Sequence, residues 1–153
     1  MDIRRLALVS LFILFGATTA RADLELYLNS LNFSAQGNFG GYRAALGAHF
    51  GAPNAQLDLL FRTVDRPGDA ALCLWLSRQS RQPLEVVLDR YRGRKGAGWG
   101  ALAKDLGIQP GSPAFKALKA GEIGWHPGSA APSAGRHPGD GRSGPPTGKR
   151  KQG

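Results

Sequence analysis

Residues 83–107, PLEVVLDRYRGRKGAGWGALAKDLG, decide the predicted fold class because two amphipathic patterns flank a glycine-rich turn. Pro83 suits the first turn of a helix, and the apolar side chains after it repeat with the helical period until Gly93. A second pattern begins at Trp99 and ends at Gly107. The stretch therefore predicts two short helices that each bury one face. The apolar positions are Leu84, Val87, Leu88 and Tyr91 in the first helix and Trp99, Leu102, Ala103 and Leu106 in the second.

Helical patterns continue on both sides of this stretch. Upstream, the spacing of apolar residues predicts helices over 39–50, 54–64 and 67–76, with Asn54 as a capping residue. Downstream, a serine cap and a glycine stop bound a last helix over 112–121. The connections, about two to six residues long, are normal for a compact domain. The apolar positions are Phe39, Tyr42, Leu46 and Phe50; Leu57, Leu60, Phe61 and Val64; Leu72, Trp75 and Leu76; and Phe115 and Leu118.

Residues 24–33 fit two patterns. Leu24, Tyr27, Leu28 and Leu31 have helical spacing, whereas Leu24, Leu26 and Leu28 alternate as in a strand. We favour the helix.

The predicted fold is all-α, a compact cluster of six or seven short helices over 23–124 followed by a disordered basic tail over 125–153. The chain carries a net charge of +9, and residues 123–153 hold five basic side chains against one acidic side chain. A tail rich in Gly and Pro cannot bury enough apolar surface to offset the entropy of ordering. Trp125, at its start, is placed to pack back on the domain.

The first 22 residues have the pattern of a secretory signal peptide. Arg4 and Arg5 precede an uncharged apolar run over 6–17, and small residues before Asp23 predict cleavage after Ala22. The run is about a dozen residues long, and a membrane-spanning helix needs roughly 20. We therefore expect a periplasmic or secreted protein with no transmembrane segment in the mature chain. An uncleaved anchor is the alternative.

No catalytic or metal-binding motif is recognisable in the sequence. An enzyme would have to use His49 with a nearby carboxylate, because the other two histidines lie in the tail. The acidic residues, Asp65 and Asp69 among them, are expected at helix caps and on solvated faces. Cys73 is the single cysteine and is predicted to be a buried small apolar residue. We assign no catalytic residue, metal site or cofactor, and an enzyme is the less favoured alternative.

The most unusual stretch is the basic, glycine-rich turn before Trp99. Arg92, Arg94 and Lys95 precede a helix start, where unpaired N–H groups attract negative charge. Together with Trp99 they are candidates for an anion site. The competing interpretation is structural: the glycines form a tight corner, Trp99 anchors the core and the arginines are solvated.

The helices over 99–118 also have the rhythm of a helix-turn-helix, which with the basic charge would suggest nucleic-acid binding. The predicted export opposes this function. The second helix also offers few base-reading side chains, since its outer positions are Ala114, Lys116, Ala117 and Ala120. We expect no specific nucleic-acid partner.

Residues 92–119 contain the motif GWG-x-x-A-K-x-LGI-x-PGS-x-x-F-x-x-LK. This motif resembles a family of small exported bacterial proteins of unknown function, and the resemblance extends back to about residue 39. It implies export and one helical domain, and it brings no activity or ligand. The sequence as a whole favours an exported, non-enzymatic helical module that binds a protein partner or an anionic envelope surface, and it leaves the oligomeric state open.

Overall fold

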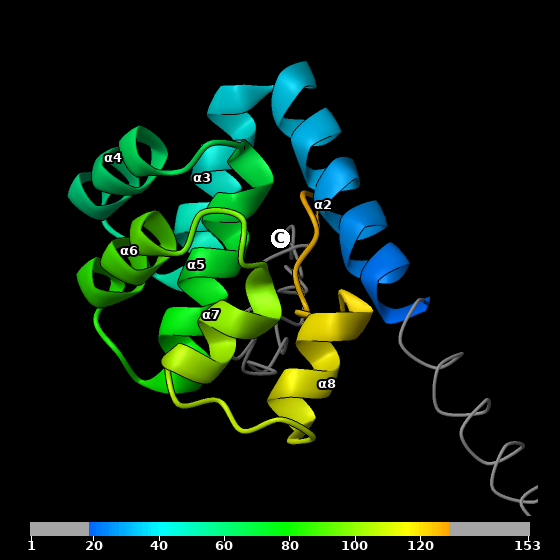
Figure 1. Ribbon diagram of the computed structural model, residues 1–153. Coiled ribbons are helices and arrows are strands. Elements are labelled where there is room, and N and C mark those ends of the chain that lie inside the picture. Colours follow the sequence, from blue (N-terminus) through cyan, green and yellow to red (C-terminus); the bar gives the residue numbers. More distant parts are fainter. Residues whose placement is uncertain (1–18, 129–153) are drawn as a thin grey trace, which may run out of the picture.

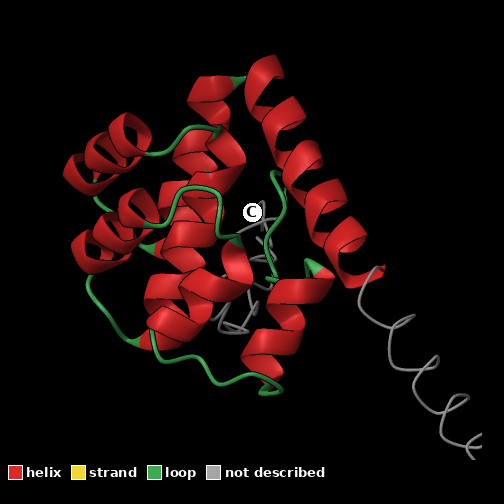
Figure 2. Cartoon of the chain, in the orientation of Figure 1, coloured by secondary structure: helices red, strands yellow, loops and turns green. Residues whose placement is uncertain are grey.

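The computed structural model describes residues 19–128, and the side chains from Ala22 onward. This part of the chain forms seven α-helices and no strand (Figures 1 and 2), so the predicted all-α cluster is confirmed. Within these residues no helix has both the length and the apolar character needed to cross a bilayer. The helices are α2 (Thr19–Gly37), α3 (Phe39–Phe50), α4 (Asn54–Thr63), α5 (Pro67–Ser80), α6 (Leu84–Gly93), α7 (Trp99–Asp105) and α8 (Pro113–Ala120).

Helix α5 is the central element of the cluster. It packs against α2, α3, α4 and α6, and every residue from Gly68 to Leu76 is buried. A helix that is buried on all sides needs apolar residues all round rather than one stripe. The sequence pattern of Leu72, Trp75 and Leu76 predicted only one face of this helix.

The first turn of α5 is held by side chains from other helices. Its N-cap residue, Arg66, makes no side-chain capping bond. Instead, Asn32 of α2 accepts a 2.7 Å hydrogen bond from the Gly68 N–H, and the Tyr42 hydroxyl of α3 donates to the Pro67 carbonyl at 2.9 Å. A Cβ atom on Gly68 would lie 2.9 Å from the Leu28 carbonyl oxygen, so α2 and α5 approach closely here.

Most predicted helix ends are confirmed. Gly51 and Gly121 adopt left-handed conformations after α3 and α8, and the Ser112 hydroxyl accepts from the Phe115 N–H at 3.2 Å. The prediction for Asn54 was wrong: Pro53 is the N-cap and Asn54 is the first helical residue, without a side-chain capping bond.

The ambiguous segment over 24–33 is helical. It belongs to α2, which begins at Thr19 and therefore runs through the predicted cleavage point between Ala22 and Asp23. Among the side chains that the structure describes, from Ala22 onward, the first buried one in α2 is Leu24. The rest of the predicted signal peptide, residues 1–18, lies outside the described residues.

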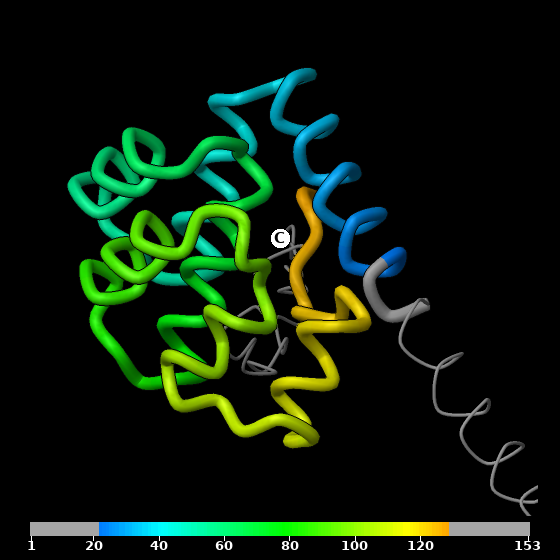
Figure 3. The backbone as a smooth tube through the Cα atoms, in the orientation of Figure 1, coloured from blue at the N-terminus to red at the C-terminus, as the bar shows by residue number. Residues whose placement is uncertain are grey.

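The segment after α8 runs back alongside α2 (Figure 3) and completes the core. Trp125 is 1 % exposed, with its ring 5.3 Å from that of Tyr42. The Tyr27 hydroxyl donates a 2.6 Å hydrogen bond to the Trp125 carbonyl, and the His126 ring lies 5.3 Å from the Tyr27 ring. Trp125 thus packs back on the domain, beyond the predicted boundary at 124. Residues 129–153 of the predicted tail lie outside the described part.

One predicted core position is wrong. Phe39, at the start of α3, is 47 % exposed. Its ring packs edge-on against Phe61 of α4 at 5.0 Å, at the margin of the core.

We expect Gly68→Ala to destabilise the fold by about 1–3 kcal/mol, because the added methyl group overpacks the contact between α2 and α5. Urea unfolding measures this loss. Gly93→Ala is the matched control: its Cβ would meet nothing within 4 Å and its φ is not positive. The control should be neutral or slightly stabilising. A Gly68→Ala variant as stable as the control would contradict the close approach.

Candidate functional site

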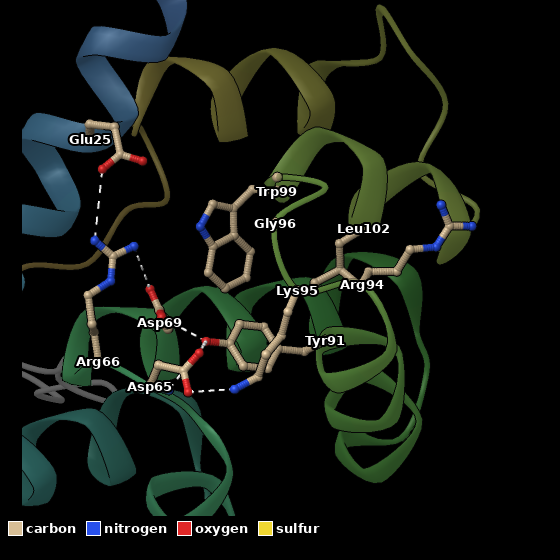
Figure 4. Close-up of a pocket in the computed structure, with 11 residues that line it drawn as sticks. Glu25, Asp65, Arg66, Asp69, Tyr91, Arg94, Lys95, Gly96, Trp99 and Leu102 are labelled. Atoms are coloured by element: carbon tan, nitrogen blue, oxygen red, sulfur yellow. Dashed lines mark hydrogen bonds and ion pairs between the residues drawn. The ribbon is translucent and has the colours of Figure 1, made fainter.

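A cavity of about 310 Å³ lies between α2, the start of α5, the end of α6 and the α6–α7 loop. We call it the Asp69 cleft (Figure 4), and it brings together segments separated by up to about 75 residues. Its walls combine three carboxylates, three cations and two aromatic rings. The lining residues are Glu25, Asp65, Arg66, Asp69, Tyr91, Arg94, Lys95, Gly96, Gly98, Trp99 and Leu102.

Asp69 is the one charged residue classed as buried in the described part of the chain, at 3 % exposed. Its Oδ2 accepts a 2.8 Å hydrogen bond from the Tyr91 hydroxyl. Its Oδ1 is buried and receives no hydrogen bond, although Arg66 Nη2 lies 3.4 Å away as an ion-pair partner. Burial raises the pKa of Asp69, and the contacts with Tyr91 and Arg66 act in the opposite direction without cancelling that effect.

The cations of the cleft are already matched by carboxylates. Lys95 Nζ lies 2.7 Å from Asp65 Oδ1, and this hydrogen bond is the largest cause of a lowered pKa at Asp65. Arg94 makes a two-point contact with Asp105, at 2.7 Å and 3.0 Å. Asp105 belongs to α7 and lies outside the Asp69 cleft.

Arg66 is shared between two carboxylates. It lies 4.0 Å from Glu25 and 3.4 Å from Asp69, with ion-pair but no hydrogen-bond geometry to either. Once Arg94 is paired with Asp105, two cations remain among the lining residues for three carboxylates. The lining is formally neutral with Arg94 included, and it carries one excess negative charge when Arg94 is counted with its partner Asp105 outside the cleft.

Two aromatic rings also line the Asp69 cleft. Tyr91 and Trp99 lie with their ring centroids 5.6 Å apart and their planes at 32°. In Figure 4 the Trp99 indole lies between the Glu25–Arg66 pair and Tyr91. The Tyr91 hydroxyl bonds to Asp69 and also accepts from the Asp65 N–H at 3.3 Å, so this ring is fixed from two sides.

A second hollow of about 600 Å³ adjoins the first and extends between α2, α7 and α8. The two share Glu25, Arg94, Gly96, Gly98 and Trp99 as lining residues, so they lie next to each other. We call the combined depression the Trp99 groove. The second hollow adds apolar walls and further cations: Leu24, Phe115 and Leu118, with Lys104 and Lys119.

The structure places three of the four predicted anion-site residues around the Asp69 cleft. Arg94, Lys95 and Trp99 line it, whereas Arg92 is exposed and lies outside its lining. Since Arg94 and Lys95 are paired with carboxylates, they do not present free positive charge. Helix α7 also has only seven residues and no side-chain cap, so its start offers a short dipole.

Sequence reasoning missed the centre of the site. Asp69 was expected at a cap or on a solvated face, and it is buried because α5 is covered on all sides. The available signal was a carboxylate directly before the uninterrupted apolar run over 70–76. Tyr91 was predicted as a core residue, and its hydroxyl instead reaches the cleft.

His49 lacks the surroundings of a catalytic base. Its ring packs against Phe50 and Trp125, and its Nδ1 is buried without a hydrogen bond. Burial, followed by the charge of Arg78, lowers its pKa. No carboxylate among residues 22–128 pairs with it, and it lines neither hollow. Cys73 is fully buried as predicted, and burial raises its pKa.

No described cluster of His, Cys, Asp and Glu side chains could hold a metal ion. No family model, curated protein or solved structure matches this chain.

The pKa shifts of Asp69 and Asp65 predict opposite pH dependences. A carboxyl whose pKa is raised by folding disfavours the folded state once pH rises past its unfolded value, so Asp69→Asn should gain stability relative to wild type between about pH 4 and pH 7. A carboxyl whose pKa is lowered contributes stability that is lost on acidification. Asp65→Asn should therefore lose stability near pH 7 and approach wild type near pH 3. Urea unfolding at several pH values measures both, and the same sign for the two variants would refute the assignment.

Proposed function

We propose that this chain is an exported, non-catalytic helical module that binds a protein partner in the Trp99 groove. Export is supported by the leader pattern over 1–22. The core residues of the described side chains, Leu24 and those after it, all follow the expected cleavage point.

The observation that carries the proposal is that two hollows adjoin, with Trp99 in the lining of both. One hollow has a charged lining around Asp69, and the other has walls that include Leu24, Phe115 and Leu118. Protein interfaces combine apolar contact with a few placed polar groups, and they are enriched in aromatic anchors such as Trp. An extended segment that presents one polar and one apolar side chain would match both parts of the groove.

An anionic surface is the second candidate partner, and different residues favour it. Arg90 and Arg92, in the last turn of α6, are exposed and make no ion pair within the described chain. Charge reversal at Arg94 or Lys95 would also break their ion pairs with Asp105 and Asp65, so a loss of binding would have two causes. Arg90→Glu with Arg92→Glu keeps those pairs. If this candidate is right, the double variant loses most of its salt-sensitive binding to vesicles of anionic lipid, and unchanged binding removes it.

Site-specific photocrosslinking tests the proposed function. A photoreactive phenylalanine analogue replaces Ala97 or Lys104, both exposed groove residues, in the full chain inside cells that export it. Leu59, exposed on α4 and outside both hollows, is the control position. We expect the same single protein to crosslink from both groove positions and not from the control. Equal products from all three positions, a glycan product or no product from the groove would contradict the proposal.

A further inference from the structure

We propose that the partner enters the Asp69 cleft with a lysine side chain, whose primary ammonium pairs with Oδ1 of Asp69. This inference rests on the proposed function and names the group that the groove recognises. It starts from Oδ1 of Asp69, a buried oxygen with no hydrogen bond of good geometry, whose nearest cation, Arg66 Nη2, stands at an ion-pair distance of 3.4 Å.

Charge favours a cation over an anion in this cleft. Among the lining cations, Lys95 forms an ion pair with Asp65, and Arg94 forms one with Asp105. Arg66 lies at ion-pair distance from both Glu25 and Asp69. An incoming cation would neutralise the excess negative charge. Inside the Asp69 cleft, an incoming anion would have to break an existing ion pair before it met a cation, and the lysines without a described ion pair, Lys104 and Lys119, line the adjoining hollow.

The geometry favours an ammonium over a guanidinium. A guanidinium binds best to two carboxylate oxygens at once, but Oδ2 of Asp69 is already taken by the Tyr91 hydroxyl. The other oxygen, Oδ1, has only the 3.4 Å ion-pair contact with Arg66, which a compact donor could supplement with a hydrogen bond. The rings of Tyr91 and Trp99 stand at the same cleft, and aromatic faces within about 6 Å attract a cation.

The adjoining hollow favours a polypeptide as the source of the ammonium. A lysine side chain has an apolar stem of four carbons, for which Leu102 and the two rings offer apolar contact. Beyond Trp99, the groove continues between Leu24, Phe115 and Leu118. A small free amine would leave those apolar walls empty, whereas residues beside the lysine in a chain would cover them.

Two matched peptides test the inference on the full wild-type protein. They are Ac-Leu-Lys-Leu-NH₂ and the same peptide with norleucine in place of lysine, and calorimetry with the NMR signal of the Trp99 indole N–H reports binding. We expect the lysine peptide to bind at least about tenfold more tightly, as a charge-assisted hydrogen bond allows. Equal affinities, or tighter binding of a glutamate peptide, would overturn the inference.

Variants assign the preference to Asp69. Asp69→Asn keeps an acceptor for the Tyr91 hydroxyl and should bind both peptides equally. Asp89→Asn removes the same charge from an exposed position on α6 outside both hollows and should keep the tenfold preference. A preference that survives in Asp69→Asn would overturn the assignment. Butylamine that binds as tightly as the lysine peptide would overturn the polypeptide source.

This test separates the two proposals. Equal peptide affinities together with groove-specific crosslinks overturn the lysine inference and leave the binding function in place. Absence of groove-specific crosslinks overturns the function itself.

Discussion

The close approach of α2 and α5 at Gly68 is the contact on which the rest of the structure depends. A Cβ atom at this position would lie 2.9 Å from the Leu28 carbonyl oxygen, so a larger residue would push the helices apart, and Asn32 supplies the hydrogen bond that the uncapped start of α5 lacks. With its first turn fixed in this way, α5 lies inside the cluster and the other helices pack around it. Its apolar residues then form the centre of the core.

The same contact determines where the charged group of the site lies. Asp69 follows Gly68 directly, so burial of the first turn of α5 carries a carboxyl group out of water. Burying a charge costs free energy unless it is paired and hydrogen-bonded. Tyr91 satisfies one oxygen and Arg66 approaches the other without a hydrogen bond. A partly satisfied group of this kind opposes stability, which is the pattern expected where function competes with packing.

Much of the fold could be predicted from local patterns. Apolar stripes, helix caps and glycine stops depend on only a few neighbouring residues. The structure confirms such features at Leu84, Val87 and Leu88, at Ser112 and at Gly121. The site could not be predicted in this way because it depends on distant pairs. Lys95 meets Asp65 across 30 positions of the sequence, and Arg94 pairs with Asp105, so two of the predicted anion-site cations are neutralised by carboxylates. An apolar stripe on one face of a helix does not show whether the other faces are covered as well. The burial of Asp69 was missed for this reason.

We infer that Asp69 is buried with a negative charge that its neighbours do not fully neutralise. A titration of its carboxyl carbon by ¹³C NMR, assigned with Asp69→Asn, measures this directly. We predict a midpoint above the ordinary aspartate pKa of about 3.9, because burial outweighs the contacts with Tyr91 and Arg66. A midpoint below that value would show instead that Arg66 and Tyr91 fully neutralise the carboxylate.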